Sequence, residues 1–247
     1  MVKNERLEGK TDSEKVNFAF LDHLVESLFS ENPMFTEEEI RGETISMLVE
    51  GYENISSGNS FALLLLAFHP DIQKRAFKEL FDIFGSNKRR SATFQDLQEM
   101  TYLEQIIKET LRLYPSLPFI PRGVEEELKI GDYILPVGST ILINLLSTQR
   151  NPKYFSSPHK FDPDNFSPEK KRAQHPFAFI PFSYGPRMCV GLKYAMFQMK
   201  GMLSTILRHY QLLPVGKLED LERLEFVLSL APVLGVNLKL IPRSYDV

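Results

Sequence analysis

Residues 182–191 read Phe-Ser-Tyr-Gly-Pro-Arg-Met-Cys-Val-Gly and contain the only cysteine of the chain, Cys189, between two glycines. A helical pattern follows over residues 190–209, so the cysteine stands at the entrance of a predicted helix. Backbone amides at a helix N-terminus stabilise a thiolate over a thiol. Gly185 and Gly191 allow the backbone to approach a flat ligand closely. The stretch therefore predicts a thiolate that is presented to a flat partner.

Arg187 lies two residues before the cysteine and can reach an anionic group such as a carboxylate. An iron–thiolate site beside a porphyrin propionate requires this combination of groups. The alternative is that a lone cysteine is simply a small buried hydrophobe. Four positions around Cys189 argue against that alternative, because they fit the pattern F-x-x-G-x-R-x-C-x-G; they are Phe182, Gly185, Arg187 and Gly191.

That pattern is the one by which the chain resembles the cytochrome P-450 family, over roughly residues 18–240. The resemblance implies that Cys189 is the axial thiolate ligand of haem b (iron protoporphyrin IX) and that Arg187 anchors a propionate. It also implies a mainly α fold with small β-sheets, the C-terminal half of the P-450 fold. That half consists of a long helix that crosses the haem, an E-x-x-R helix, the haem-binding loop and the helix after the loop.

We expect residues 1–247 to form a single domain fragment, the C-terminal half of a P-450 domain. The resemblance places the membrane anchor and much of the substrate pocket in an N-terminal half, so we expect both to be absent from this chain. The most apolar run, residues 61–68, is far shorter than the ~20 residues that a bilayer requires.

Glu109 and Arg112 match the family's E-x-x-R motif, and a spacing of three places both side chains on one face of a helix. In isolation such a pair would be a solvated surface pair, but the apolar helix around it favours a buried structural role. In relatives an arginine of the P-E-R-F segment completes the network; here Asn165 stands at that position, so the third arm is weaker or comes from another residue. Arg122 stands where relatives place a second propionate-binding arginine; the alternative is an ordinary surface arginine.

Thr36 and Glu39 form a capping box that opens a long helical pattern. Its apolar positions are Ile40, Ile45, Leu48, Tyr52, Ile55 and residues 63–66. The polar positions that share one face are Glu43, Glu50, Glu53, Asn54 and Ser57. Such a stripe is usually solvated. The abundant apolar residues predict instead that this helix is largely buried. Burying a carboxylate is costly, so buried carboxylates on this face would indicate a functional site.

The resemblance identifies this helix as the one that crosses above the haem. Gly51 keeps the family's glycine, which allows close approach to the haem, and Glu53 keeps its acid. Asn54 replaces the usual threonine, and an amide holds a water well but relays protons less well than a hydroxyl. We therefore expect Glu53 and Asn54 to form the catalytic proton-delivery pair. A glutamate at the position of Glu50 is typical of the insect-type family-4 branch, where it can esterify a haem methyl.

The remaining elements follow from periodicity and turn residues. Helices are expected over residues 71–84 and 100–114, strands over 128–135 and 140–145, and a long ordered loop over 151–182. Residues 224–230 and 237–240 are expected to close the chain as a hairpin.

Composition excludes several classes of function. A net charge of −3 offers no footprint for nucleic acid, and 43% hydrophobic with 25% charged residues is typical of a globular protein. One cysteine permits no internal disulfide and no multi-cysteine zinc site. The resemblance implies an apolar small-molecule substrate of a fatty-acid-like kind. It also implies NADPH-cytochrome reductase as electron donor and a location on the cytosolic face of the endoplasmic reticulum membrane.

The first interpretation is a haem-thiolate monooxygenase that inserts one atom of O2 into an apolar substrate. A second is a truncated, non-catalytic remnant or haem-binding fragment, which Asn54 and Asn165 support. A third is an unrelated thiol enzyme with Cys189 as nucleophile. The third needs a histidine base, and the candidates are His23, His69, His159, His175 and His209, none in a recognisable arrangement.

Overall fold

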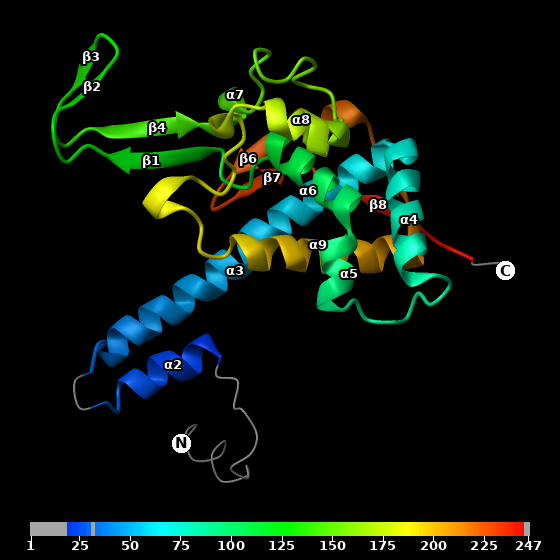
Figure 1. Ribbon diagram of the computed structural model, residues 1–247, viewed down its shortest axis with the longest axis horizontal. Helices are drawn as coiled ribbons and strands as arrows, with labels where there is room; N and C mark the ends of the chain where they lie inside the picture. Colours follow the sequence, from blue (N-terminus) through cyan, green and yellow to red (C-terminus); the bar gives the residue numbers. More distant parts are fainter. Residues whose placement is uncertain (1–18, 31–32, 245–247) are drawn as a thin grey trace. The chain divides into compact units, whose positions relative to one another are not determined.

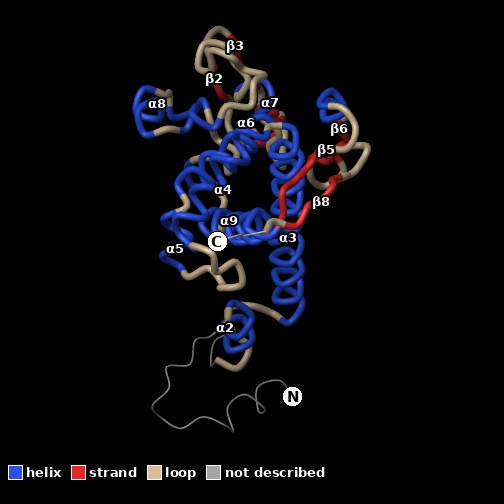
Figure 2. The backbone as a smooth tube through the Cα atoms, turned by 90° about the vertical axis from the view of Figure 1, so that its right-hand side faces the viewer, coloured by secondary structure: helices blue, strands red, loops and turns tan. Residues whose placement is uncertain are grey.

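The structure is a computed structural model that describes residues 19–30 and 33–244. Helices make up most of its regular backbone, and the strands are short (Figure 2). This confirms the predicted fold class, mainly α with small β-sheets. The chain divides into two units, Met1–Glu50 and Gly51–Val247, which are described separately below.

The described part of the first unit contains α2 (Phe20–Ser27) and the beginning of α3 (Glu37–Phe68). Pairs of apolar residues alternate with pairs of polar ones over residues 20–27, an amphipathic pattern that fits α2. The capping box is present. The Thr36 amide donates to Glu39 Oε2 at 2.7 Å, and the Glu39 amide donates to Thr36 Oγ1 at 3.2 Å. These bonds satisfy amides that the first helical turn leaves without partners, and they fix where α3 starts.

The prediction that α3 is largely buried holds for its second half and, in its first half, for Ile40, which is buried. From Ile55 to Ala67 most apolar side chains belong to the core. Ile45, Leu48 and Tyr52 are instead 55%, 65% and 58% exposed. The prediction was wrong for these positions, which do not belong to the core cluster of the described residues.

Four helices build the core of the second unit (Figure 1): the later part of α3, α4 (Pro70–Phe84), α6 (Thr101–Leu113) and α9 (Leu192–His209). Each contributes apolar residues at spacings of three or four, which place them on one helix face. Those of α6 and α9 are Leu103, Ile106, Ile107, Met199, Leu203 and Leu207. The helix α4 begins one residue before the predicted start, α6 is one residue shorter than predicted at each end, and α9 begins two residues later than predicted.

The strands among the described residues form four two-stranded antiparallel sheets. They pair as β1 (Phe119–Gly123) with β4 (Thr140–Asn144), β2 (Leu128–Ile130) with β3 (Tyr133–Leu135), β5 (Tyr210–Pro214) with β8 (Leu238–Pro242), and β6 (Leu224–Phe226) with β7 (Leu230–Pro232). The predicted run 128–135 is thus itself a hairpin. Gly131 makes its turn with a φ of +58°, a conformation that favours glycine.

The predicted closing hairpin was wrong. Residues 224–230 do not pair with residues 237–240, because β6 turns directly back onto β7 and β8 pairs with β5. The strand β5 directly follows α9, so β8 returns along the end of that helix. Local alternation of apolar residues indicated strands but carried no information about their partners.

Residues 151–182 form the expected long loop, with three short helical turns: η1 (Pro163–Phe166), α8 (Pro168–Ala173) and η2 (Pro176–Ala178). Each turn starts with a proline, whose fixed φ suits a first helical position. Two smaller helices, α5 (Phe94–Glu99) and α7 (Leu145–Thr148), complete the helices named here. Within residues 19–30 and 33–244, no helix combines the length and apolar character that crossing a bilayer requires.

Candidate functional site

The loop that carries Cys189 is a tight turn closed by backbone hydrogen bonds. The Cys189 amide donates to the carbonyl of Phe182 at 2.9 Å, and the Met188 amide donates to that of Gly185 at 3.0 Å. The turn passes through left-handed backbone at Ser183 (φ 64°) and Gly185 (φ 78°). Glycine is required at the second position for its conformation, because a side chain there would be strained. The resulting loop leaves Cys189 exposed.

Two neighbours fix this loop against the rest of the unit. Phe182 is half-buried and packs against the core cluster. Gly191 caps the start of α9, and its carbonyl accepts the first helical hydrogen bond from Ala195 at 2.8 Å. Cys189 therefore lies between a core anchor and a helix start, as the sequence predicts. A Cβ on Gly191 would lie 3.8 Å from Cys189 Sγ, an ordinary contact, so the fold itself does not demand this glycine.

Arg122 reaches the cysteine loop from a different element. It lies on β1 opposite Ile141, and its Nη2 donates to Ser183 Oγ at 2.7 Å. Its Nη1 donates to the carbonyl of Pro121 at 2.7 Å. Arg187 is exposed within the loop itself. Two guanidinium groups thus belong to this site, one within the loop and one bonded to it from β1.

The groups at the loop fit a haem. Iron in a porphyrin needs only an axial ligand from the protein, and one exposed thiol in a fixed turn supplies it. The loop also displays apolar surface, since Val190 is 90% and Met188 50% exposed. Apolar side chains suit a porphyrin face, and the two arginines suit its carboxylates. Within residues 19–30 and 33–244, no group of three His, Cys, Asp or Glu side chains is arranged to hold a bare metal ion.

The polar residues predicted on α3 lie in different surroundings. Glu53 is half-buried, and its Oε1 accepts a hydrogen bond from Ser229 Oγ at 3.1 Å. The backbone carbonyl of Asn54 accepts one from Ser116 Oγ at 2.7 Å. Gly51 has open space beside it, because a Cβ there would meet no atom within 4 Å. The described interactions therefore join Glu53 and Asn54 to Ser229 and Ser116 rather than to the cysteine loop.

Glu50 is exposed and belongs to the first unit, as does Glu43. Ser57, by contrast, is buried, and its hydroxyl donates to the carbonyl of Leu230. The predicted polar face thus changes from exposed to buried along the helix.

Glu109 and Arg112 form the buried pair that the sequence predicts, and both side chains are fully inaccessible. Arg112 Nε donates to Glu109 Oε2 at 2.7 Å, and Nη2 donates to Oε1 at 2.8 Å. The remaining guanidinium protons go to the carbonyls of Gln149, Pro158 and Lys160 at 2.7–3.0 Å. The pair therefore holds the start of the long loop against α6, as a structural element would.

Asn165 does complete this network, as a neutral arm. Its Nδ2 donates to Glu109 Oε1 at 3.1 Å, and the Asp162 amide donates to the same oxygen at 2.9 Å. Burial raises the pKa of Glu109, and the bonds from Arg112, Asp162 and Asn165 oppose that rise. With two nearly fixed amide donors and a bidentate arginine, the carboxylate keeps a full set of partners without a second positive charge.

Sequence reasoning missed Gln149. Its side chain is buried and donates to the carbonyls of Leu111 and Arg112 at 3.0 and 3.2 Å. Its Oε1 accepts a bond from the Ile180 amide at 3.1 Å, which ties the end of α6 to the segment before the cysteine loop. Ser116 and Ser229 were missed as well. Their partners are far away in the sequence, so no local pattern signals them.

Three of the histidines bond to nearby backbone groups. Nδ1 of His69 and of His209 lies 2.8 Å from the carbonyl four residues earlier in its own helical segment. The Nδ1 of His175 accepts a bond from the Phe177 amide at 3.2 Å. These nitrogens serve local backbone, so they give no support to a thiol nucleophile activated by a histidine base.

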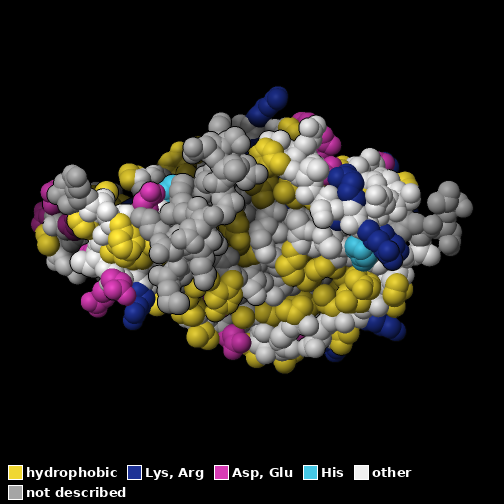
Figure 3. Space-filling model, turned by 90° about the horizontal axis from the view of Figure 1, so that it is seen from below, with side chains coloured by type: hydrophobic (Ala, Val, Ile, Leu, Met, Phe, Trp, Pro, Cys, Tyr) yellow, Lys and Arg dark blue, Asp and Glu magenta, His cyan; other side chains and the backbone are white. Residues whose placement is uncertain are grey.

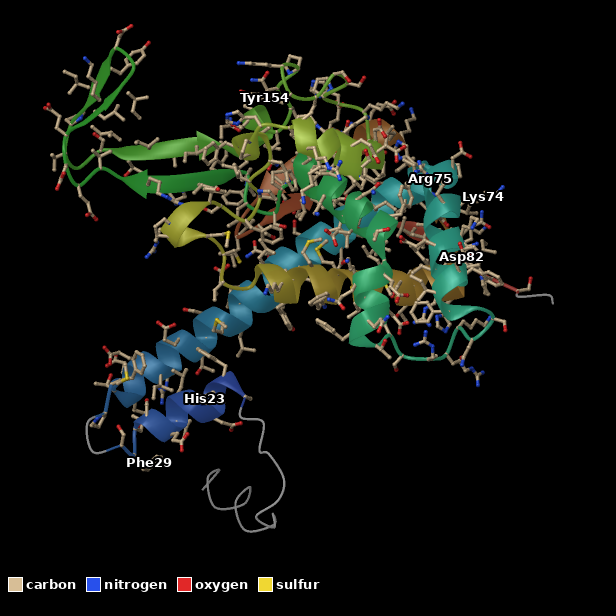
Figure 4. All side chains as sticks on the ribbon, in the orientation of Figure 1. His23, Phe29, Lys74, Arg75, Asp82 and Tyr154 are labelled. Atoms are coloured by element: carbon tan, nitrogen blue, oxygen red, sulfur yellow. The ribbon has the colours of Figure 1, made fainter. Side chains whose placement is uncertain are left out.

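A surface cavity of about 310 Å³ lies beside α8. Its lining includes Tyr154, which Figure 4 labels in the loop after α7, together with Lys170 and Asn165. None of the residues lining it belongs to the cysteine loop.

The chain is similar over most of its length to proteins of one family. A family model described as cytochrome P-450 matches residues 1–236. The chain is 42% identical to cytochrome P-450 4g15 of Drosophila melanogaster over 244 residues, which cover 96% of this chain and 41% of the relative. It is 42% identical to cytochrome P-450 4c3 of the same organism (93% and 43% covered) and 39% identical to cytochrome P-450 4V2 of Homo sapiens (96% and 45% covered). The chain thus spans less than half the length of these relatives.

Proposed function

Because this chain belongs to the cytochrome P-450 family, we propose that the protein is a haem-thiolate monooxygenase with Cys189 as the axial ligand. The observation that carries the proposal is the exposed thiol of Cys189, whose backbone amide donates to the Phe182 carbonyl in a turn that directly precedes α9. Haem, when bound, supplies iron that activates O2, so that with two electrons and two protons one oxygen atom enters a C–H bond and the other leaves as water.

The chain's own residues bind and orient the cofactor. Arg187 and Arg122 are proposed to bind the propionates through their guanidinium protons, since charge-assisted bonds to carboxylates are their preferred contacts. The hydrogen bond from Arg122 to Ser183 supports this role, because it already directs that side chain to the loop. Gly185 sets the turn, Gly191 keeps the backbone beside the thiol free of a side chain, and Phe182 anchors the loop in the core.

Residues of α3 are proposed to handle protons. Glu53 would take up a proton at a carboxylate oxygen, and Asn54 would hold a water through its amide. Gly51 would allow close approach of the helix to the haem, which the open space beside it permits. Glu50 is proposed as the residue that can form an ester with a haem methyl, and haem retained on the polypeptide after acid extraction would support that ester.

The finer features of the function rest on kinship with the relatives named above. We propose an apolar, fatty-acid-like substrate, NADPH-cytochrome reductase as the electron donor, and a location at the endoplasmic reticulum membrane, facing the cytosol. One observation favours a second candidate, a non-catalytic haem-binding remnant. An asparagine occupies position 54, where a hydroxyl would relay protons better.

The test is the spectrum of the complete protein that carries this chain. The reduced protein with carbon monoxide should give the red-shifted Soret band of thiolate ligation, and Cys189→Ala should abolish that band. Met188→Leu, a change at the exposed neighbour, serves as control and should leave the band in place. A thiolate-type band that persists in Cys189→Ala would refute the assignment. A wild-type band without substrate turnover in the presence of reductase would favour the remnant.

A further inference from the structure

The turn between β6 and β7 is fastened to α3 through backbone groups. The amide of Leu230 donates to the carbonyl of Ser116 at 2.7 Å, and the hydroxyl of Ser116 donates to the carbonyl of Asn54 at 2.7 Å. The carbonyl of Leu230 accepts a hydrogen bond from the buried hydroxyl of Ser57. Both polar backbone groups of Leu230 are therefore engaged, and each leads back to α3. These bonds fix the turn beside residues 54–57 of α3.

Ser229 precedes Leu230 and makes a bond of a different kind. Its hydroxyl, in a residue only 6% exposed, donates to Glu53 Oε1 at 3.1 Å. This is a side-chain contact with a carboxylate, whereas the other three bonds end on backbone carbonyls. Three other hydrogen bonds already join the turn to Ser116 and α3. Its distinct effect falls on the carboxylate, whose rotation it limits.

We propose that Ser229 is a positioning residue that holds the Glu53 carboxylate in the orientation required for proton transfer. The inference rests on the proposed function, because it assigns a partner to the acid of that function. In this proposal Oε1 accepts the serine hydroxyl and Oε2 exchanges protons with water. The hydroxyl is preorganised because the adjacent Leu230 is fixed at both its amide and its carbonyl. Ser229 acts through Glu53 and needs no contact with the reacting atoms.

Alternative roles for Ser229 are purely structural, and a matched pair of variants separates them. Ser229→Thr and Ser229→Val have nearly the same shape and differ in one hydroxyl. The complete holoprotein with its reductase is used for turnover. Ser229→Val should lower kcat by roughly tenfold with little change in KM, since loss of a positioned acid slows the step without weakening binding. Ser229→Thr should retain most of the wild-type kcat. Equal kcat values in the two variants would overturn the proposal.

Ser57→Ala is the control for a loosened turn. It removes a hydrogen bond between the same turn and the same helix but does not touch the carboxylate. It should lower the thermal unfolding midpoint about as much as Ser229→Val does, yet keep kcat within roughly twofold of wild type. If Ser57→Ala lowers kcat as much as Ser229→Val, the effect is that of a loosened turn and the proposal fails.

Two further measurements make the role of Glu53 explicit. In a Glu53→Gln background, Ser229→Val should cause no further fall in kcat, because the group that it positions no longer carries a transferable proton. Independently of activity, the infrared carboxylate stretch that disappears in Glu53→Gln should shift in Ser229→Val and not in Ser229→Thr. An unshifted band would contradict the inference even if Cys189 is the ligand. Loss of the Cys189 assignment, seen in the carbon monoxide spectrum, would instead remove the proposed function.

Discussion

Arg112 and Glu109 carry opposite charges at a place that water does not reach, and this is tolerated because every strong hydrogen-bonding group has a partner. The guanidinium serves three backbone carbonyls besides the carboxylate. The carboxylate in turn accepts bonds from an amide side chain and a backbone amide. A network of this kind fixes the loop by directed hydrogen bonds, and it does so without a second positive charge. Neutral Asn165 therefore performs the positioning that a second cation would perform.

The neutrality of Asn165 gives a prediction at the scale of one residue. Asn165→Asp is nearly isosteric but replaces a donor to Glu109 with a second negative charge. It should lower the free energy of unfolding by about 1–3 kcal/mol at neutral pH, because a hydrogen bond becomes a repulsion. Chemical denaturation of the holoprotein measures this.

Asp164→Asn, at the adjacent position, is the control for that experiment. Asp164 pairs with Arg75, labelled on α4 in Figure 4, at 2.9 Å, and both side chains are about half exposed. Loss of such a pair costs about 0–1 kcal/mol. If Asn165→Asp proves no more harmful than Asp164→Asn, Asn165 is not a member of the buried network.

At the scale of the element, two glycines of α3 differ in how closely other atoms approach them. Gly58 is buried where α3 crosses α9, and a Cβ there would lie 2.8 Å from the terminal methyl of Met199. Gly51 has no atom within 4 Å of that position. A side chain at Gly58 would therefore displace that methyl group and would also meet Leu111 Cδ2 at 3.4 Å. The described fold therefore places no steric demand on Gly51.

These two glycines should respond differently to substitution. Gly58→Val should lower the free energy of unfolding by about 1–3 kcal/mol, because Met199 must leave its place in the core. Gly51→Ala should raise it by about 0.5–1 kcal/mol in the haem-free protein, since alanine favours a helix. Gly51→Ala should nevertheless reduce haem content. Unfolding curves and haem-to-protein ratios measure both effects, and full haem loading of Gly51→Ala would show that α3 does not need that space.

The short helix α5 depends on one carboxylate. Asp96 accepts hydrogen bonds from Arg90 at 2.6 and 3.0 Å and from the amide of Thr93, the N-cap residue, at 2.7 Å. The Arg90 guanidinium, helped by Thr93 and opposed by burial, holds the pKa of Asp96 well below its usual range. The folded state therefore favours the ionised form, and the link between α5 and the preceding loop is sensitive to acid.

The sign of this linkage gives a pH-dependent prediction. An unfolded aspartate has a pKa of about 3.9, so the stabilisation is complete above that pH and declines as the pH falls toward the lower folded pKa. Asp96→Asn should therefore lower the free energy of unfolding at pH ~7, and the difference from wild type should shrink below pH ~4. Asp82→Asn is the control, because Asp82, labelled in Figure 4, forms only an exposed pair with Lys78. A difference that stays constant down to pH ~3 would contradict the assigned role.

At the scale of the molecule, the described part exposes much apolar surface. Figure 3 shows hydrophobic side chains over a large part of the face seen from below. In the second unit, Val190, Val227 and Tyr133 are 90%, 81% and 76% exposed. Large exposed apolar patches favour association with other surfaces. A haem between the Cys189 loop and the Gly51 helix would, on the proposed function, need further walls to exclude water.

Residues 1–247 produced alone should therefore be a poor enzyme. We expect aggregation or chaperone binding, and poor coupling of oxygen reduction to substrate oxidation, because water would reach the iron. Size-exclusion chromatography, haem titration and turnover with a reductase and a panel of fatty acids measure this. Stable monomeric holoprotein with coupled turnover would show that this chain suffices.

The helices and the cysteine loop could be predicted from the sequence because the patterns that indicate them are local. Apolar spacing in α6 and α9, the Thr36 capping box and the glycines around Cys189 each act within a few residues. The partners of the strands could not be predicted in this way. The hydrogen-bond partners of Ser116 and Ser229 lie 62 and 176 residues away, and no periodic pattern in the sequence extends that far. The exposure of Ile45 and Leu48 was also unpredictable, since amphipathic spacing indicates a face but not what covers it.

The Arg112 network has a consequence for the order of events during synthesis at the ribosome. Glu109 and Arg112 are three residues apart and can pair as soon as α6 forms, whereas Asn165 follows Glu109 by 56 positions. At about 5–20 residues per second, translation delivers that last partner roughly three to eleven seconds later. During this interval Glu109 and Arg112 can pair with each other. The guanidinium N–H groups that later bond to backbone carbonyls remain hydrated. The early pair thus keeps both charges neutralised until the loop with Asp162 and Asn165 is synthesised and completes the network.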